Sequence, residues 1–215
     1  MRIYLIRHGV TKSNLENVRQ SREGYLSEDG IQQSRALASK LSGLAIDSIF
    51  TSSYPRARQT ADIISALGKG FLVQESQYLE EIRLPSEVVG KPVEDQKSKN
   101  ILSRLWSHRT NPSWRYSDEE TFKEYVSRAH FVLDHISNTG FKNVVVVTHH
   151  RFIEVLVGIV LLKEKLTPAL FAELKERLYV SNTGITIIDQ NQGGGWRLFT
   201  LNEHSHIEER AAGSS

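Results

Sequence analysis

The 215-residue chain contains no cysteine, and its charges nearly cancel to a net +2. The missing thiols exclude disulfides, thiol catalysis and cysteine-ligated metal, and they fit a reducing cytoplasm, which is the compartment we expect. The small net charge gives no electrostatic case for a nucleic-acid partner or for an anionic membrane surface. We therefore expect neither partner.

Long hydrophobic runs are also missing. The longest apolar stretch, near residues 153–162, carries Glu154 and falls short of the roughly 20 residues that a membrane-spanning helix needs. The first residues enter an apolar strand directly, without a basic region followed by an apolar segment, so we expect no secretory signal. Residues 208–215 are polar and end in Ala-Ala-Gly-Ser-Ser, which predicts a flexible tail.

The apolar content of 39% and charged content of 24% are typical of a globular protein, and residues 1–207 are expected to form a single domain. Apolar strand patterns alternate with helical patterns along the chain. This alternation predicts an α/β fold, a three-layer α/β/α sandwich around a mainly parallel sheet. Residues 184–189 and 196–201, joined through three glycines, predict a hairpin that adds an antiparallel edge strand.

Two of the predicted strands end in histidine. The apolar run at residues 3–6 stops at Arg7-His8-Gly9, and the run at residues 144–147 stops at Thr148-His149. A short apolar run that ends at a turn residue is typical of a buried strand. Ligands of open α/β sheets bind outside the carboxyl ends of the strands, so two strands that end in this way predict one shared site.

Helix start signals place a further arginine near the same edge. Pro55 fits the first turn of a helix that follows a strand at residues 46–51, so Arg56 lies in that first turn, where backbone N–H groups favour an anion. Ser27 is the expected N-cap of an earlier helix, after a polar loop at residues 9–26. Further expectations are a strand at residues 71–74, a helix after residue 118 capped by Ser117 or Asp118, and a helical and loop excursion at about residues 84–117 that covers the pocket.

These residue types suit phosphoryl transfer. A neutral imidazole nitrogen can attack phosphorus and hold it covalently, and Arg7 beside His8 disfavours the imidazolium form. Guanidinium groups match phosphate oxygens in geometry and in charge. A carboxylate such as Glu81 could protonate the leaving oxygen and later activate water. Because arginine and histidine supply the positive charge, the chemistry requires no metal and no cofactor.

Several blocks of the sequence resemble the histidine phosphatase superfamily, which includes the cofactor-dependent phosphoglycerate mutases. They occur in family order over about residues 2–160, and they are Leu5-Ile6-Arg7-His8-Gly9-Val10-Thr11-Lys12-Ser13-Asn14, Leu26-Ser27-Glu28-Asp29-Gly30-Ile31-Gln32-Gln33, Thr51-Ser52-Ser53-Tyr54-Pro55-Arg56-Ala57-Arg58-Gln59-Thr60-Ala61, Leu79-Glu80-Glu81-Ile82 and Val145-Val146-Val147-Thr148-His149.

The resemblance implies a phosphoglycerate mutase-like fold and a set of site residues. His8 would be the phospho-accepting nucleophile and Glu81 the acid, with Glu80 as the alternative. Arg7, Arg56 and His149 would complete the phosphate pocket, and Asn14 would be a further substrate contact. Departures from the family pattern leave the substrate open: His150 and Arg151 replace two small residues, and Arg22 and Arg83 lie in atypical loops. These four side chains either select a second anionic group or are solvated charges.

Three functions compete at this level. The first is a metal-independent phosphatase that hydrolyses small phosphorylated metabolites through phosphohistidine. The alternatives on the same fold are a phosphoglycerate mutase-type phosphoryl transfer and a catalytically weak regulatory or binding protein. A metal hydrolase that uses His149, His150 and Glu154 is disfavoured, because the sequence has no His-Glu-x-x-His pattern. The pattern leaves the natural substrate and the oligomeric state open.

Overall fold

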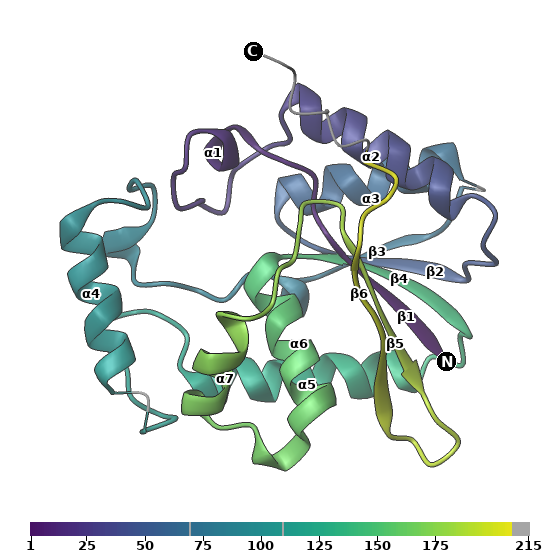
Figure 1. Cartoon of the computed structure of the whole chain (residues 1–215). Helices are drawn as coiled ribbons and strands as arrows, with labels where there is room; N and C mark the ends of the chain where they lie inside the picture. The colour runs from purple at the N-terminus through teal and green to yellow at the C-terminus, as the bar shows by residue number, and fades with distance from the viewer. Residues whose placement is uncertain (69, 109, 208–215) are drawn as a thin grey trace.

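A single sheet organises the fold in the computed structural model, which describes residues 1–68, 70–108 and 110–207 (Figure 1). Within these ranges, six strands are arranged in the order β3-β2-β4-β1-β5-β6. Their bounds are β1 Arg2–Arg7, β2 Ser48–Ser52, β3 Val73–Ser76, β4 Asn143–Thr148, β5 Ile185–Gln190 and β6 Trp196–Glu203. The tail predicted at residues 208–215 lies outside the described residues.

The sheet is parallel over β3, β2, β4 and β1, and β5 runs antiparallel to both of its neighbours. The hairpin expected near the end of the chain is thus present as β5 and β6, and it forms one edge of the sheet. The strand expected at residues 71–74 begins two residues later, and the strand expected at residues 46–51 is β2, Ser48–Ser52.

Helices cover both faces of the sheet, as the alternating pattern predicts (Figure 1). Along β1 the side chains alternate: Ile3 and Leu5 pack into one core cluster, and Tyr4 and Ile6 pack into the other. The first cluster includes side chains of α5 (Phe122–Ser137), α6 (His150–Leu162) and α7 (Pro168–Lys175), and the second includes those of α2 (Glu28–Leu41) and α3 (Pro55–Leu67). The three-layer α/β/α architecture is confirmed.

Most of the local start signals also act as expected. Ser27 caps α2 through its side chain, and Pro55 stands in the first turn of α3. The N-cap of α5 was expected at Ser117 or Asp118, and that is wrong. Thr121 is the cap, because its hydroxyl accepts from Glu124 N while the Glu124 carboxylate accepts from Thr121 N, a complete capping box.

The polar loop expected at residues 9–26 contains one short helix, α1 (Lys12–Leu15). The helical and loop excursion expected at residues 84–117 contains α4 (Gln96–Ser107). Single 3-10 turns occur at Gln77–Leu79, Ser86–Val88 and Lys163–Lys165.

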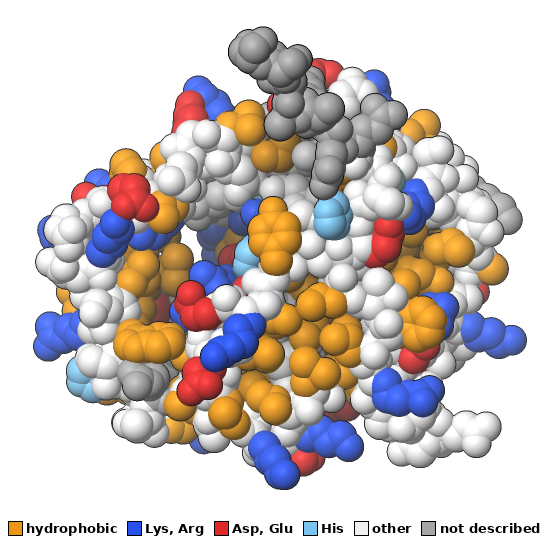
Figure 2. Space-filling model, in the orientation of Figure 1, with side chains coloured by type: hydrophobic (Ala, Val, Ile, Leu, Met, Phe, Trp, Pro, Cys, Tyr) orange, Lys and Arg blue, Asp and Glu red, His pale blue; other side chains and the backbone are white. Residues whose placement is uncertain are grey.

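Two basic side chains from other parts of the chain contact the excursion. The Arg19 guanidinium, from the loop after α1, donates to the carbonyls of Pro92 and Val93. The Lys175 ammonium of α7 lies 5.1 Å from the centroid of the Trp106 ring of α4. In Figure 1, α4 lies outside the sheet and its covering helices, on the side of α1 and α7. Figure 2 shows a surface hollow between the excursion and the rest of the molecule, with Lys or Arg side chains on its wall.

Candidate active site

Strand register brings His8 and His149 together. Arg7 is paired with Thr148 in the parallel β1–β4 ladder, so the next residue of each strand lies at the same level. His8 N donates to the Thr148 carbonyl at 3.0 Å, and the two imidazole centroids are 5.2 Å apart. After β1 the chain continues to α2 on one face, and after β4 it continues to α6 on the other face. The pair therefore occupies a topological switch point, where ligands of α/β sheets bind.

The hydrogen bonds of His8 show that Nε2 carries no proton. Its Nδ1 lies 2.7 Å from the Gly9 carbonyl, and a carbonyl can only accept, so Nδ1 carries the proton. Arg56 Nε donates to His8 Nε2 at 3.3 Å. Burial holds the pKa of His8 well below 6.5, and the positive charges of Arg56 and Arg7 lower it further. The ring is thus a neutral imidazole at neutral pH.

His149 is fully buried on the other side of the site. Its Nε2 and the Ser52 hydroxyl, at the end of β2, are 2.8 Å apart, and the ring meets the edge of Tyr54 with centroids 5.0 Å apart. Burial lowers the pKa of His149 well below 6.5, and the positive charge of Arg56 is the next largest cause of the lowering. Its buried Nδ1 has no hydrogen-bond partner in the described structure, so it is a polar group open to a ligand.

Two arginines supply positive charge beside His8. Arg56 is 2% exposed in the first turn of α3 and donates from Nη1 to the Ser21 carbonyl at 2.8 Å. Burial lowers its pKa to about 10, so it stays protonated at neutral pH. Arg7 donates from Nη1 to the Val180 carbonyl at 2.7 Å, while its buried Nε has no partner among the described residues. Backbone carbonyls therefore fix both side chains and leave their charge for an anion.

Glu81 lies at the N-terminus of α6. Its Oε1 accepts from the backbone N–H groups of Ile82 and Phe152, both at 3.0 Å, and its Oε2 accepts from Arg151 N at 3.2 Å. Glu80 points elsewhere: its carboxylate accepts from Arg22 and from the Ser53 hydroxyl. Of the two glutamates, Glu81 is the one held on the helix turn that follows His149.

The four additional cationic candidates are engaged by protein groups. Arg22 pairs with Glu80 at 2.8 Å. Arg83 donates from Nε to the Asp118 carbonyl at 2.7 Å, at the foot of the excursion. His150 and Arg151 both bind the carboxylate of one residue, Glu154, each at 2.9 Å. The structure thus groups His150 and Arg151 with the N-terminus of α6, and it joins Arg83 to the excursion.

Asn14 is part of the loop that shapes the site rather than an isolated polar group. Its side chain accepts from Thr11 N, which closes a capping box on α1. The Nδ2 amide of Asn182 donates to the His8 carbonyl at 2.9 Å and lies 3.4 Å from Asn14 Oδ1. Asn182 therefore links the His8 backbone to the Asn14 side chain.

Close packing of the loop after His8 depends on glycine. A Cβ on Gly9 would lie 2.6 Å from the Gly30 carbonyl oxygen of α2, and a Cβ on Gly30 would lie 2.0 Å from the Val10 carbonyl oxygen. The bare backbones can approach because neither residue carries a side chain. This contact sets the path of the chain directly after His8.

Sequence reasoning missed several supporting residues. Ser52, Asn182 and Arg128 contact site residues or their backbone, and Arg128 donates to the carbonyls of Tyr78 and Glu80 while its guanidinium pairs with Glu120. Ser52 could have been found, since it ends a predicted strand as His8 and His149 do. Arg128 lies in a helix whose pattern indicates only a core face, so the sequence carries no signal for its role.

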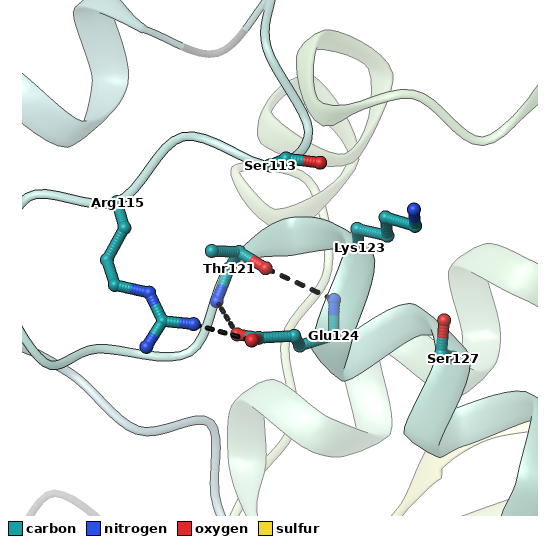
Figure 3. A pocket seen from close by; sticks show the side chains of 6 residues that line it. All are labelled: Ser113, Arg115, Thr121, Lys123, Glu124 and Ser127. Atoms are coloured by element: carbon teal, nitrogen blue, oxygen red, sulfur yellow. Dashed lines mark hydrogen bonds and ion pairs between the residues drawn. The ribbon is translucent and has the colours of Figure 1, made fainter.

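A second concavity, lined by residues between Ser113 and Ser127, contains none of the candidate site residues. Its lining residues gather around the first turn of α5, where Thr121 and Glu124 form the capping box and Arg115 pairs with Glu124 (Figure 3). Its one ion pair, Arg115 with Glu124, is closed within the protein. No group of three or more histidine, cysteine or acidic side chains suited to a metal ion occurs in the part of the chain that the structure describes.

Comparison of the sequence with models of known protein families identifies the family. The model of the histidine phosphatase superfamily (branch 1) matches residues 3–204. The chain belongs to this superfamily. The match covers β1 from Ile3 onward, both strand-terminal histidines and the closing hairpin, so the expected family and its phosphoglycerate mutase-like fold are confirmed.

Related histidine phosphatases carry both phosphatase and mutase names. A probable phosphatase of Schizosaccharomyces pombe is 27% identical over 99% of this chain and 98% of its own. A probable phosphoglycerate mutase of Cronobacter sakazakii is 26% identical over 98% of this chain and 97% of its own. The fold is shared with phosphoserine phosphatase from Entamoeba histolytica in complex with 3-phosphoglyceric acid, with a TM-score of 0.76, 23% identity, and coverage of 95% and 98%. Within the described residues, no helix is long and apolar enough to cross a membrane.

Proposed function

We propose that this protein is a metal-independent phosphatase that hydrolyses small phosphomonoesters through a phosphohistidine on His8. The observation that carries the proposal is the unprotonated Nε2 of His8, which accepts from Arg56 in a pocket that also presents Arg7 and His149. A neutral, fixed nitrogen among buried cationic groups is the arrangement that nucleophilic attack on a phosphate requires.

In the first half-reaction the Nε2 lone pair attacks phosphorus, a P–N bond forms, and the P–O bond to the leaving oxygen breaks. The leaving oxygen takes up the proton of the Glu81 carboxyl group, which becomes the carboxylate that serves the second step. Arg7 and Arg56 offset the charge on the equatorial oxygens, because their backbone partners hold them in place before substrate binds. The unpartnered Nδ1 of His149 and Nε of Arg7 are the buried polar atoms that the phosphoryl oxygens would satisfy.

In the second half-reaction water attacks the phosphohistidine, the P–N bond breaks, and His8 returns to its neutral form. Glu81 suits the base in this step. A carboxylate offers about four acceptor positions, of which backbone N–H groups take two on Oε1 and one on Oε2. One position on Oε2 remains for a water proton, at the turn that also presents His149.

One assay tests the function: hydrolysis of an aryl phosphate, with a chelator present, by the native protein, by His8→Ala and by His130→Ala. His130 is an exposed histidine of α5, so its variant is a matched control. We expect chelator-resistant turnover that His8→Ala abolishes and that the control retains. Equal activity in His8→Ala, or loss of activity with chelator, would overturn the proposal.

The same enzyme would next be given monophosphorylated and bisphosphorylated small metabolites. Release of inorganic phosphate supports hydrolysis, whereas transfer of the phosphoryl group to a second position of the substrate would assign a mutase. Absence of turnover with every ester tested, in a folded protein, would point to a binding role on the same fold.

A further inference from the structure

The chain directly before β5 holds Arg7 and His8 by hydrogen bonds. The Val180 carbonyl accepts from Arg7 Nη1 at 2.7 Å, and Thr183 N donates to the Arg7 carbonyl at 2.9 Å. The side-chain amide of Asn182 donates to the His8 carbonyl at 2.9 Å. This segment therefore contacts both the guanidinium of Arg7 and the backbone that carries the proposed nucleophile.

The backbone of this segment, residues 180–183, is strained at Thr183. Thr183 is fully buried and has a φ of 56°, which is a genuine outlier for a β-branched residue. Such a conformation persists only where the surrounding structure enforces it. Since the N–H of the strained residue is itself a donor to Arg7, the groups that enforce this conformation also determine where Arg7 lies.

The side chain of Asn202, near the end of β6, fastens the middle of the segment. Its Oδ1 accepts from the backbone N–H and from the hydroxyl of Ser181, each at 2.8 Å. Ser181 is flanked by two residues that contact the site, Val180 and Asn182. One amide oxygen thus fixes the segment at a point from which both contacts extend.

A β-bulge places Asn202 in this position. β6 has one residue more than β5 between two successive ladder pairs, Ile187 with Thr200 and Ile185 with Glu203. Asn202 lies inside this bulge with a φ of 50°, in the left-handed region that asparagine adopts more readily than most residues. Bulges next to active sites re-aim side chains, and this one directs the amide toward the segment before β5.

We propose that Asn202 is a positioning residue for the phosphate pocket, because by fixing Ser181 it holds the segment that sets Arg7 and His8 before substrate binds. This rests on the proposed function. Attack on phosphorus requires the nitrogen and the phosphate to meet in a near-attack geometry, and a misplacement of about 1 Å can cost about 100-fold in rate. Release of Ser181 would let the contacts to Arg7 and His8 shift together.

Glycine and aspartate at position 202 separate the acceptor oxygen from the backbone conformation. Asn202→Gly removes the oxygen while glycine adopts the positive φ without strain, and Asn202→Asp keeps an oxygen that accepts from Ser181. We expect Asn202→Gly to lower kcat for an aryl phosphate by about tenfold to 100-fold and to change KM by less than about threefold, because the phosphate meets the same charges while the attack geometry is lost. Asn202→Asp should stay within about threefold of the native kcat.

Asn191→Gly is the matched control at the other end of the same hairpin. Asn191 follows β5, and its Oδ1 also accepts from two backbone N–H groups, those of Gly193 and Gly195, each at 3.0 Å. This variant should lower the thermal unfolding midpoint and keep the native kcat. An equal loss of kcat in Asn191→Gly, a native kcat in Asn202→Gly, or a failure of Asn202→Asp to restore kcat would each overturn the role of Asn202.

The imidazole NMR resonances of His8 report the position of the ring without turnover. They are assigned by their loss in His8→Ala, and Asn202→Gly should shift them whereas Asn202→Asp and Asn191→Gly should not. Resonances that stay in place in Asn202→Gly would refute the proposal.

A second variant carries the test if Asn202→Gly does not fold. Ser181→Ala removes the hydroxyl bond and keeps the backbone bond to Asn202, so it should shift the same resonances less and lower kcat about fivefold. A Ser181→Ala protein with native kcat and resonances would count against the proposal. Native turnover that is absent, or independent of His8, would overturn the proposed function instead, and the resonance shifts would still decide the role of Asn202.

Discussion

Acidification should destabilise this protein through the two histidines of its pocket. In the folded chain the pKa values of His8 and His149 lie well below 6.5, because both rings are buried and Arg56 repels a further positive charge. The unfolded chain has no such constraint, so its two histidines take up protons near pH 6.5. Below that pH the unfolded state binds more protons than the folded state, and the free energy of unfolding falls as pH falls.

The size follows from the linkage relation. Each histidine that stays neutral in the folded chain contributes a slope of about 1.4 kcal/mol per pH unit below its unfolded pKa. For the pair, the free energy of unfolding should drop by up to about 2.7 kcal/mol between about pH 7.5 and pH 5.5. The carboxyl groups with lowered pKa values, such as Glu203 at about 2, lose their contribution at lower pH. His206, whose pKa is lowered by burial, adds to the slope in the same direction.

Urea unfolding at a series of pH values, without phosphate in the buffer, measures this slope. His8→Asn and His149→Asn should each remove about half of the pair's contribution, while His206 continues to contribute in every variant. The asparagine amide at position 8 can still donate toward the Gly9 carbonyl, which limits other damage. A stability that is flat over this pH range, or a slope that both variants leave unchanged, would refute the view that the pocket keeps its histidines neutral.

Three further changes test how the site is held. Arg56→Lys removes the planar fork that reaches both His8 and a backbone carbonyl, and kcat/KM for an aryl phosphate should fall about 100-fold while the protein stays folded. Gly30→Ala sets a Cβ 2.0 Å from a backbone oxygen, so chemical denaturation should show a loss of about 2 kcal/mol, whereas Gly43→Ala, with open space around it, should be near neutral. Arg128→Met leaves the largely buried Glu120 carboxylate without its ion-pair partner. The free energy of unfolding, measured by the same chemical denaturation, should fall by about 3 kcal/mol.

The sequence is most informative where a signal is local. Ser27, Pro55 and the strand-terminal histidines each follow a simple rule of capping, ring geometry or strand length, and those rules held for the elements they start or end. Boundaries were less accurate. Ser117, Asp118 and Thr121 are all N-cap residue types, and the choice of Thr121 depends on a reciprocal bond with Glu124.

The supporting contacts of the site depend on long-range packing. Burial is the largest cause of the low pKa of His8, whereas the sequence points only to the neighbouring Arg7. Glu154 reads in the sequence as an interruption of an apolar stretch, and its pairing with His150 and Arg151 becomes visible only when the first turn of α6 is formed. A partner such as Asn182, more than 170 residues from His8, leaves no periodicity to detect.

The in-register ladder of β1 against β4 has a consequence for how this protein acquires activity. These strands are separated by more than 130 residues of chain, yet each contributes one imidazole directly beyond its last ladder pair, Arg7 with Thr148. Side chains alternate between faces along a strand, so a slip by one position would send one ring to the wrong side of the sheet. Activity therefore requires this pairing in its exact register, and the time of the first turnover during refolding should report when β1 and β4 pair.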